Sequence, residues 1–287
     1  MVARFAGQGY VVVAADYFGK GPSTEPDSYL VKGSTQQACL DMLLASKSVL
    51  GSMKIAPREL FVSGWSQGGW GTLVFLQKLE SVGIAVTAAA TASAPTDIYV
   101  TVNRWINNHQ PVDAAFLTGV VALQIVSQEA YYRREGLVAA AIQPQYVAAC
   151  RDLHANRIDW AAFKEKTPGT VKEMLRPEFV ASGFLGDTAY WKTLQDEHGC
   201  RWKSRTPMRN YYGEVDEVVP VAIAKLPEQL HALMGAGPTT SVPAGAKANH
   251  RGTFLFEVAQ AGLWFDELRL AQVLDVSKRL TGASFAP

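Results

Sequence analysis

The sequence contains the pattern Gly-x-Ser-x-Gly at 64–68, the residue types expected around a serine that attacks a carbonyl group. The apolar stretch Leu60–Ser63 before it is typical of a short buried strand, and Gly71–Leu79 after it is typical of a helix. A sharp turn between strand and helix strains the serine backbone and lifts its hydroxyl clear of the sheet, and the two glycines prevent clashes in that turn. The pattern therefore predicts Ser66 as a nucleophile, with an ordinary glycine-rich turn as the alternative.

A serine hydroxyl needs a general base and a group that orients this base. In folds where the nucleophile occupies such a strand-to-helix turn, the acid and the base follow it in that order, each just beyond the end of a strand. Asp216 follows a strand expected at 208–212, and His250 follows one expected at 239–243. We therefore expect His250 to take the proton of Ser66 and Asp216 to hold the histidine tautomer.

Other residues compete for these roles. Asp97 also lies beyond the end of an expected strand, Ile84–Ala94, and is the alternative acid. Glu214 and Glu217 flank Asp216 in its loop and are expected to be solvated charges. Among the other histidines, His109, His154 and His198 lie within residues 98–200, away from the loops after the expected strands. His231 lies in a helical pattern, where a surface or packing role is expected.

The elements that must position these residues alternate between strand and helix, which is typical of an α/β fold with a mostly parallel sheet covered by helices on both faces. The β-branched run Tyr10–Ala15 predicts a strand buried on both faces, and Asp16 after it is expected to be a turn residue at the rim of the site. The expected strands are 10–15, 60–63, 84–94, 208–212 and 239–243, and the expected helices are 34–50, 71–79, 220–234 and 253–270.

Residues 98–200 interrupt this alternation because they carry amphipathic helical stretches and no clear strand. We expect a helical cap inserted between the third and fourth strands, with residues 1–97 and 201–287 forming the core domain. The apolar run Ala114–Val126 is too short to span a bilayer and suits a buried or interfacial helix, as an acyl tunnel, a lid or the core of the cap. Trp65, Tyr17 and Phe18 are candidates for the substrate pocket.

Composition narrows the classes of partner and cofactor. The 287 residues are 48% hydrophobic and carry 27 Lys and Arg against 26 Asp and Glu, which gives no electrostatic reason to expect nucleic acid or an anionic membrane as a partner. The cysteines Cys39, Cys150 and Cys200 lack the spacing of a zinc site, and Cys150 with Cys200 is the pair considered for a disulfide. We expect no metal and no organic cofactor.

The turn around Ser66, the loop with Asp216 and the loop with His250 follow one another in the order found in the α/β-hydrolase superfamily, which the sequence resembles over the whole chain. Within it the sequence is most similar to capped secretory lipases of the lipase-A type and their esterase relatives, through the stretches Gln8–Gly21, Thr91–Asn107, Gly213–Pro220 and Asn249–Phe265. The resemblance implies a serine hydrolase that cleaves a small-molecule or lipid ester, with lipid-interface contact through the cap. A serine peptidase or other amide or polyester hydrolase on the same fold is the alternative.

The resemblance also implies a difference in the oxyanion hole. In this superfamily an earlier strand lies between the strands at 10–15 and 60–63, and the loop after it donates one of two oxyanion N–H groups. The resemblance implies that this strand and its donor are absent from the chain, while the other donor, the backbone N–H of Gln67, is present. Loss of one donor costs about 3–4 kcal/mol of transition-state stabilisation, so a catalytically impaired binding protein is a third alternative.

Overall fold

Four parallel strands form the sheet in the computed structural model, which describes residues 1–184 and 189–281. The strands are β1 (Phe61–Trp65), β2 (Ala88–Ala92), β3 (Met208–Tyr212) and β4 (Thr239–Pro243), hydrogen-bonded in the order β1-β2-β3-β4. Because all four are parallel, their carboxyl ends meet at one edge of the sheet, so the loops after β1, β3 and β4 gather there.

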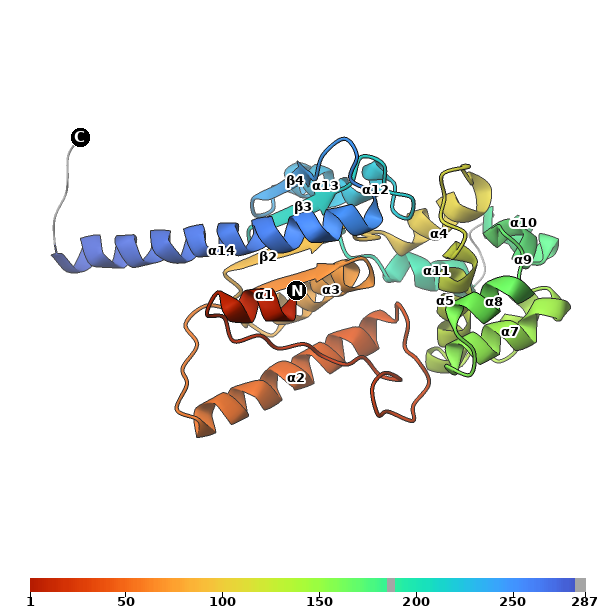
Figure 1. The fold of residues 1–287 in the computed structure, drawn as a ribbon, viewed down its shortest axis with the longest axis horizontal. Helices are drawn as coiled ribbons and strands as arrows, with labels where there is room; N and C mark the ends of the chain where they lie inside the picture. The colour runs from red at the N-terminus through yellow and green to blue at the C-terminus, as the bar shows by residue number, and fades with distance from the viewer. Residues whose placement is uncertain (185–188, 282–287) are drawn as a thin grey trace.

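Helices cover both faces of the sheet (Figure 1). Helix α3 (Gln67–Ser81) packs on one face, with α2 (Lys32–Ser52) outside it, whereas α14 (His250–Thr281) and α1 (Val2–Gly7) pack on the other. Strand β2 is fully buried and consists of alanines with one threonine, so its small side chains let α3 and α14 approach it closely. Helices α12 (Val221–Ala224) and α13 (Leu226–Met234) lie beside β3 and β4.

The expectation of a strand at Tyr10–Ala15 is wrong. Within the described residues, Val11–Ala15 form no backbone hydrogen bond, and the side chains of Val11 and Val13 are 52% and 42% exposed. A groove of about 460 Å³ separates this stretch from β1, and both line it. A strand needs a neighbour about 4.8 Å away, so a β-branched run without one stays an unpaired extended stretch. Strand β1 is consequently an edge of the sheet.

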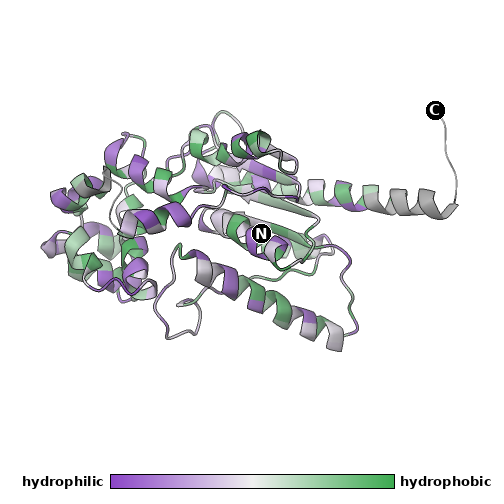
Figure 2. Cartoon of the chain, turned by 180° about the vertical axis from the view of Figure 1, so that it is seen from behind, coloured by the Kyte–Doolittle hydropathy of each residue, from purple (hydrophilic) through white to green (hydrophobic). Residues whose placement is uncertain are grey.

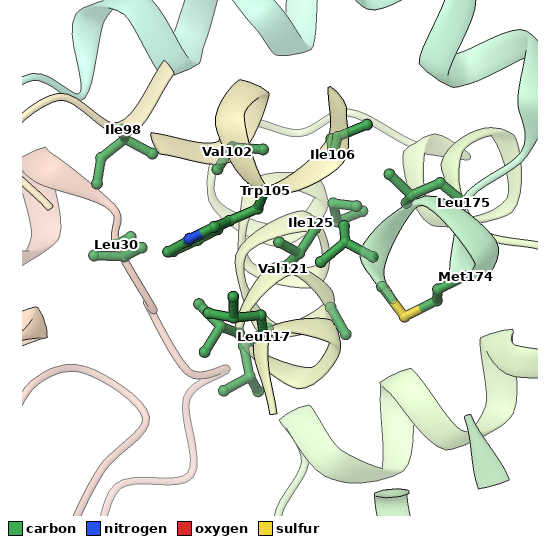
Figure 3. Packing of buried hydrophobic residues seen from close by; sticks show 14 of the residues in the cluster. Leu30, Ile98, Val102, Trp105, Ile106, Leu117, Val121, Ile125, Met174 and Leu175 are labelled. Carbon is green, nitrogen blue, oxygen red and sulfur yellow. The ribbon is translucent and has the colours of Figure 1, made fainter. Parts of the chain in front are cut away.

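Eight helices connect β2 to β3 among the described residues, and we call 98–196 the helical segment. They are α4 (Ile98–Asn107), α5 (Leu117–Tyr131), α6 (Leu137–Ala141), α7 (Pro144–His154), α8 (Trp160–Lys166), α9 (Val171–Met174), α10 (Pro177–Phe184) and α11 (Ala189–Asp196). Helix α5 is buried on all sides over its first three turns and forms the centre of a hydrophobic core (Figure 3). Leu30, from the loop before α2, joins that core beside Trp105, which ties the helical segment to the N-terminal part of the chain.

Other elements differ from the expected ones mainly at their ends. The strand expected at 84–94 is shorter, Ala88–Ala92, and the helix expected at 220–234 breaks at Lys225 into α12 and α13. Figure 2 shows hydrophobic residues along α2, where Leu44 and Val49 are exposed, as is Met53 directly after the helix. No described helix is long and apolar enough to cross a membrane.

Candidate active site

Ser66 occupies the turn between β1 and α3. Its backbone has φ 56° and ψ −120°, a left-handed conformation that costs a non-glycine residue free energy. The surrounding structure holds it there, since its N–H donates to the carbonyl of Ala92 at 2.9 Å and its own carbonyl accepts from Trp70 N–H at 3.1 Å. The hydroxyl therefore sits at the carboxyl edge of the sheet, where the strand-to-helix pattern predicts it.

The glycines of the turn are not equivalent. A Cβ atom on Gly64 would lie 2.2 Å from the carbonyl oxygen of Gly68, and one on Gly69 would lie 2.8 Å from the Cβ of Ala94. A Cβ on Gly68 would meet no atom within 4 Å. The close packing of the turn thus depends on Gly64 and Gly69, and Gly68 contributes its backbone rather than a missing side chain.

Three residues from distant parts of the chain meet at this edge. His250 Nε2 lies 2.9 Å from Ser66 Oγ, and His250 Nδ1 lies 3.0 and 3.1 Å from the two carboxylate oxygens of Asp216. One oxygen of Asp216 also accepts the backbone N–H groups of Val218 and Val219, both at 2.9 Å. These bonds hold the carboxylate in place and leave it facing the imidazole.

Asp97, the alternative acid, is engaged elsewhere. One of its oxygens accepts the N–H of Val100 at 3.1 Å and caps α4, and the other lies 3.3 Å from Arg201 Nε. The other four histidines also bond away from Ser66, namely His109 with Asp113, His154 with Ser127 and the Asp27 carbonyl, His198 with Arg201 N–H, and His231 with Thr239.

Two residues hold His250 in ways that the sequence did not reveal. Glu217, expected to be a solvated charge, accepts the backbone N–H of His250 at 3.0 Å, whereas Glu214 is exposed as expected. Trp65 donates its indole N–H to the His250 carbonyl at 3.0 Å and packs against the imidazole with ring centroids 4.9 Å apart. The only available signal was proximity along the chain, because both residues adjoin a member of the Ser66–His250–Asp216 group.

A buried carboxyl group lies behind the nucleophile strand. Glu257, two turns after His250 on α14, is fully buried and accepts the hydroxyl of Ser63 on β1. Burial raises the pKa of Glu257 to about 7. This bond joins β1, the strand that leads to Ser66, to α14, the helix that begins with His250. It therefore helps to fix the distance between Ser66 and His250.

A cavity of about 580 Å³ opens beside Ser66, between the carboxyl edge of the sheet and the helical segment. Its described lining residues carry no charged side chain: Tyr29, Leu30, Trp65, Ser66, Gln67, Gly68, Pro95, Trp105, Phe116, Val120, Trp160, Val218 and Val219. Of the residues expected to line the pocket, Trp65 does so. Tyr17 instead lines the groove beside β1, with its hydroxyl close to Gly71 of α3, and Phe18 is exposed and lines neither space.

The N-terminus of α3 points its first N–H groups toward this site. Gln67 is the first residue of α3, and within the described chain its backbone N–H bonds to no other backbone group. Such groups carry the partial positive charge of a helix N-terminus and are suited to binding an anionic oxygen.

Comparison with known proteins identifies the architecture of the chain. A scan against family models and a search of curated proteins found no match. Among solved structures, a candidate hydrolase from Legionella pneumophila aligns at a TM-score of 0.83 and 20% identity, covering 93% of this chain and 72% of that one. The rice cell wall degrading esterase LipA of Xanthomonas oryzae aligns at a TM-score of 0.76 and 22% identity, covering 89% and 70%. The chain has the α/β-hydrolase fold.

A third solved structure, Candida antarctica lipase A in its closed state, aligns at a TM-score of 0.66 and 13% identity, and the match covers 84% of this chain and 55% of that one. The resemblance to esterases and lipases of this fold is thus confirmed at the level of architecture. The groove beside β1 is lined by the extended stretch at 10–15 and by β1 itself.

All three cysteines have free thiols, so Cys150 and Cys200 form no disulfide. Burial raises the pKa of both thiols to about 12, and Cys150 lies 3.9 Å from the sulfur of Met174. These thiols are therefore protonated and behave as part of the hydrophobic core.

Proposed function

We propose that the chain is a serine hydrolase that cleaves carboxylic esters through an acyl-enzyme on Ser66. The observation that carries this proposal is the hydrogen-bonded series Ser66 Oγ, His250 and Asp216, which opens on an uncharged cavity. Serine, histidine and aspartate in this connectivity activate the hydroxyl for attack on a carbonyl carbon.

In the proposed mechanism Ser66 Oγ attacks the ester carbonyl while His250 Nε2 accepts the hydroxyl proton. Asp216 keeps the proton of the neutral imidazole on Nδ1 and stabilises the imidazolium as it forms. His250 then gives its proton to the leaving alcohol as the C–O bond breaks. Water attacks the acyl-enzyme by the same route and releases the carboxylic acid and free Ser66.

The oxyanion that forms in each step needs hydrogen-bond donors. The backbone N–H of Gln67 at the start of α3 is the donor that this chain supports. A site with this single donor stabilises the transition state by about 3–4 kcal/mol less than a site with two donors. Such an enzyme would turn over slowly but would keep an intact nucleophile. Reactivity toward a covalent probe is therefore a more sensitive test than turnover.

An ester is favoured over a peptide amide because the cavity offers few polar partners. A peptide carries a donor and an acceptor at every residue, and these would be buried unpaired against residues such as Leu30, Trp105 and Val219. Two structural neighbours are an esterase and a lipase, which agrees with this choice. We further propose that the helical segment serves as the cap that shapes the acyl site.

The test uses p-nitrophenyl esters and a fluorophosphonate probe. Ser66→Ala is expected to abolish both hydrolysis and labelling, and hydrolysis that persists in this variant would overturn the proposal. Asp216→Asn should lower kcat by about 10⁴-fold, whereas Asp97→Asn should leave it nearly unchanged. Labelling without turnover would favour a binding protein, and faster cleavage of peptide amides than of esters would favour a peptidase.

A further inference from the structure

Two aromatic residues of the helical segment form the outer wall of the cavity that opens beside Ser66. We propose that Phe116 and Trp160 bind the distal end of an extended apolar acyl chain and so set the chain-length preference of the enzyme. This inference rests on the proposed ester hydrolysis and adds the specificity-determining residues and the class of acid, which is uncharged, apolar and long enough to reach the pair.

The pair is exposed in a way that neighbouring residues of the cavity are not. Phe116 and Trp160 are 44% and 45% exposed, whereas Trp105 and Val120, which line the same cavity, are buried. The two aromatic rings meet edge to face, with centroids 6.3 Å apart and planes at 80°. The lining of the cavity therefore combines Ser66, buried apolar walls and a pair of aromatic rings in contact with water, and the exposure of this pair places it at the open side of the cavity.

The local structure fixes the position of the indole. Trp160 is the first residue of α8, and Asp159 caps this helix by accepting the N–H of Ala162 at 2.8 Å. The indole lies directly on the backbone of α5 at Gly119, where a Cβ atom would be 2.4 Å from Trp160 Cζ3 and 3.2 Å from Leu153 Cδ2. Gly119 thus provides a flat seat that a larger residue would remove.

This arrangement suits an apolar chain better than a compact or polar group. A short acyl group on Ser66 would contact the buried walls and leave the aromatic pair in water. A longer chain would cover the exposed faces of Phe116 and Trp160, so that apolar surface of both the chain and the rings is removed from water. The affinity should then rise about fourfold for each methylene that is buried. No charged side chain among the described lining residues could pair with a charged acid.

The test is the dependence of kcat/KM on acyl chain length, from p-nitrophenyl acetate to decanoate. For the unmodified chain we expect kcat/KM to rise up to about fourfold per methylene and then level off. Trp160→Ala should lower kcat/KM for octanoate and decanoate about tenfold, mainly through KM, and leave acetate unchanged. Trp160→Phe should restore part of the preference, and Val112→Ala, an exposed residue of the same segment outside the cavity, is the matched control.

Gly119→Ala tests the same contact from the other helix, because it displaces the indole of Trp160 without removing it. It should reproduce the loss on long chains, and combining it with Trp160→Ala should add no further loss on those substrates, since both act on one contact. The inference is overturned if Trp160→Ala keeps the chain-length profile of the Val112→Ala control, or if it lowers activity equally on acetate and decanoate. Failure of the proposed function itself is separate and shows as hydrolysis by Ser66→Ala.

Discussion

The contact between Glu217 and His250 yields a sharp prediction, because a residue next to the acid holds the backbone of the base. His250 is the first residue of α14, so its N–H has no acceptor one helical turn earlier, and the carboxylate of Glu217 accepts it at 3.0 Å. A hydrogen bond to a charged group contributes about 1.5–3 kcal/mol. Complete loss of that amount from the transition state would lower kcat/KM by about 10- to 150-fold.

Glu217→Ala is therefore expected to lower kcat/KM on a p-nitrophenyl ester at least about tenfold and to slow labelling of Ser66 by a fluorophosphonate. The activity of Glu217→Gln should lie between those of the unmodified chain and Glu217→Ala, because the glutamine amide oxygen still accepts the N–H of His250 but carries no charge. Glu214→Ala is the matched control, since this glutamate is exposed and on the other side of Asp216. Equal activity of Glu217→Ala and Glu214→Ala, with both variants folded by their thermal unfolding, would refute the reasoning.

Two further predictions concern stability. Gly64→Ala should lower the free energy of unfolding by more than about 3 kcal/mol or prevent folding, because its Cβ would lie 2.2 Å from a backbone oxygen. Gly68→Ala should lower it by less than about 1 kcal/mol, because its Cβ would meet no atom within 4 Å. Equal losses of the two variants in denaturant unfolding would contradict this prediction. Burial raises the pKa of Glu257 from 4.5 to about 7, so the folded chain keeps a proton that the unfolded chain releases, and stability should fall as pH rises from about 4.5 through 7. The fall due to this group is about 3 kcal/mol and should disappear in Glu257→Gln but remain in Glu267→Gln, an exposed control on α14.

The arrangement of the site explains why its parts are linked. The bond between Ser63 and Glu257 joins β1 to α14, and the indole of Trp65 joins the same strand to the carbonyl of His250. The nucleophile and the base therefore rest on two elements that contact each other directly on one side of the sheet. Movements that separate β1 from α14 are expected to reduce activity before the chain unfolds.

Much of this site could be predicted from the sequence because its signals are local. The elbow around Ser66 needs only a short strand, small residues and a helix in succession, and all three are adjacent in the chain. Asp216 and His250 could be selected among competitors because loops after parallel strands meet at one edge of a sheet. That rule requires the number and order of strands, and it does not require their exact ends.

Other features were decided only by the tertiary structure, because they depend on what lies across from a residue. Tyr10–Ala15 has the composition of a buried strand, yet it stays unpaired because a groove separates it from β1. Glu217 has the composition of a loop charge, yet its carboxylate meets the first N–H of α14. The seat of Trp160 on Gly119 joins residues of two helices in the same way. A sequence determines the conformations that each residue favours, whereas pairing, burial and cavity shape follow from neighbours that only the folded chain brings together.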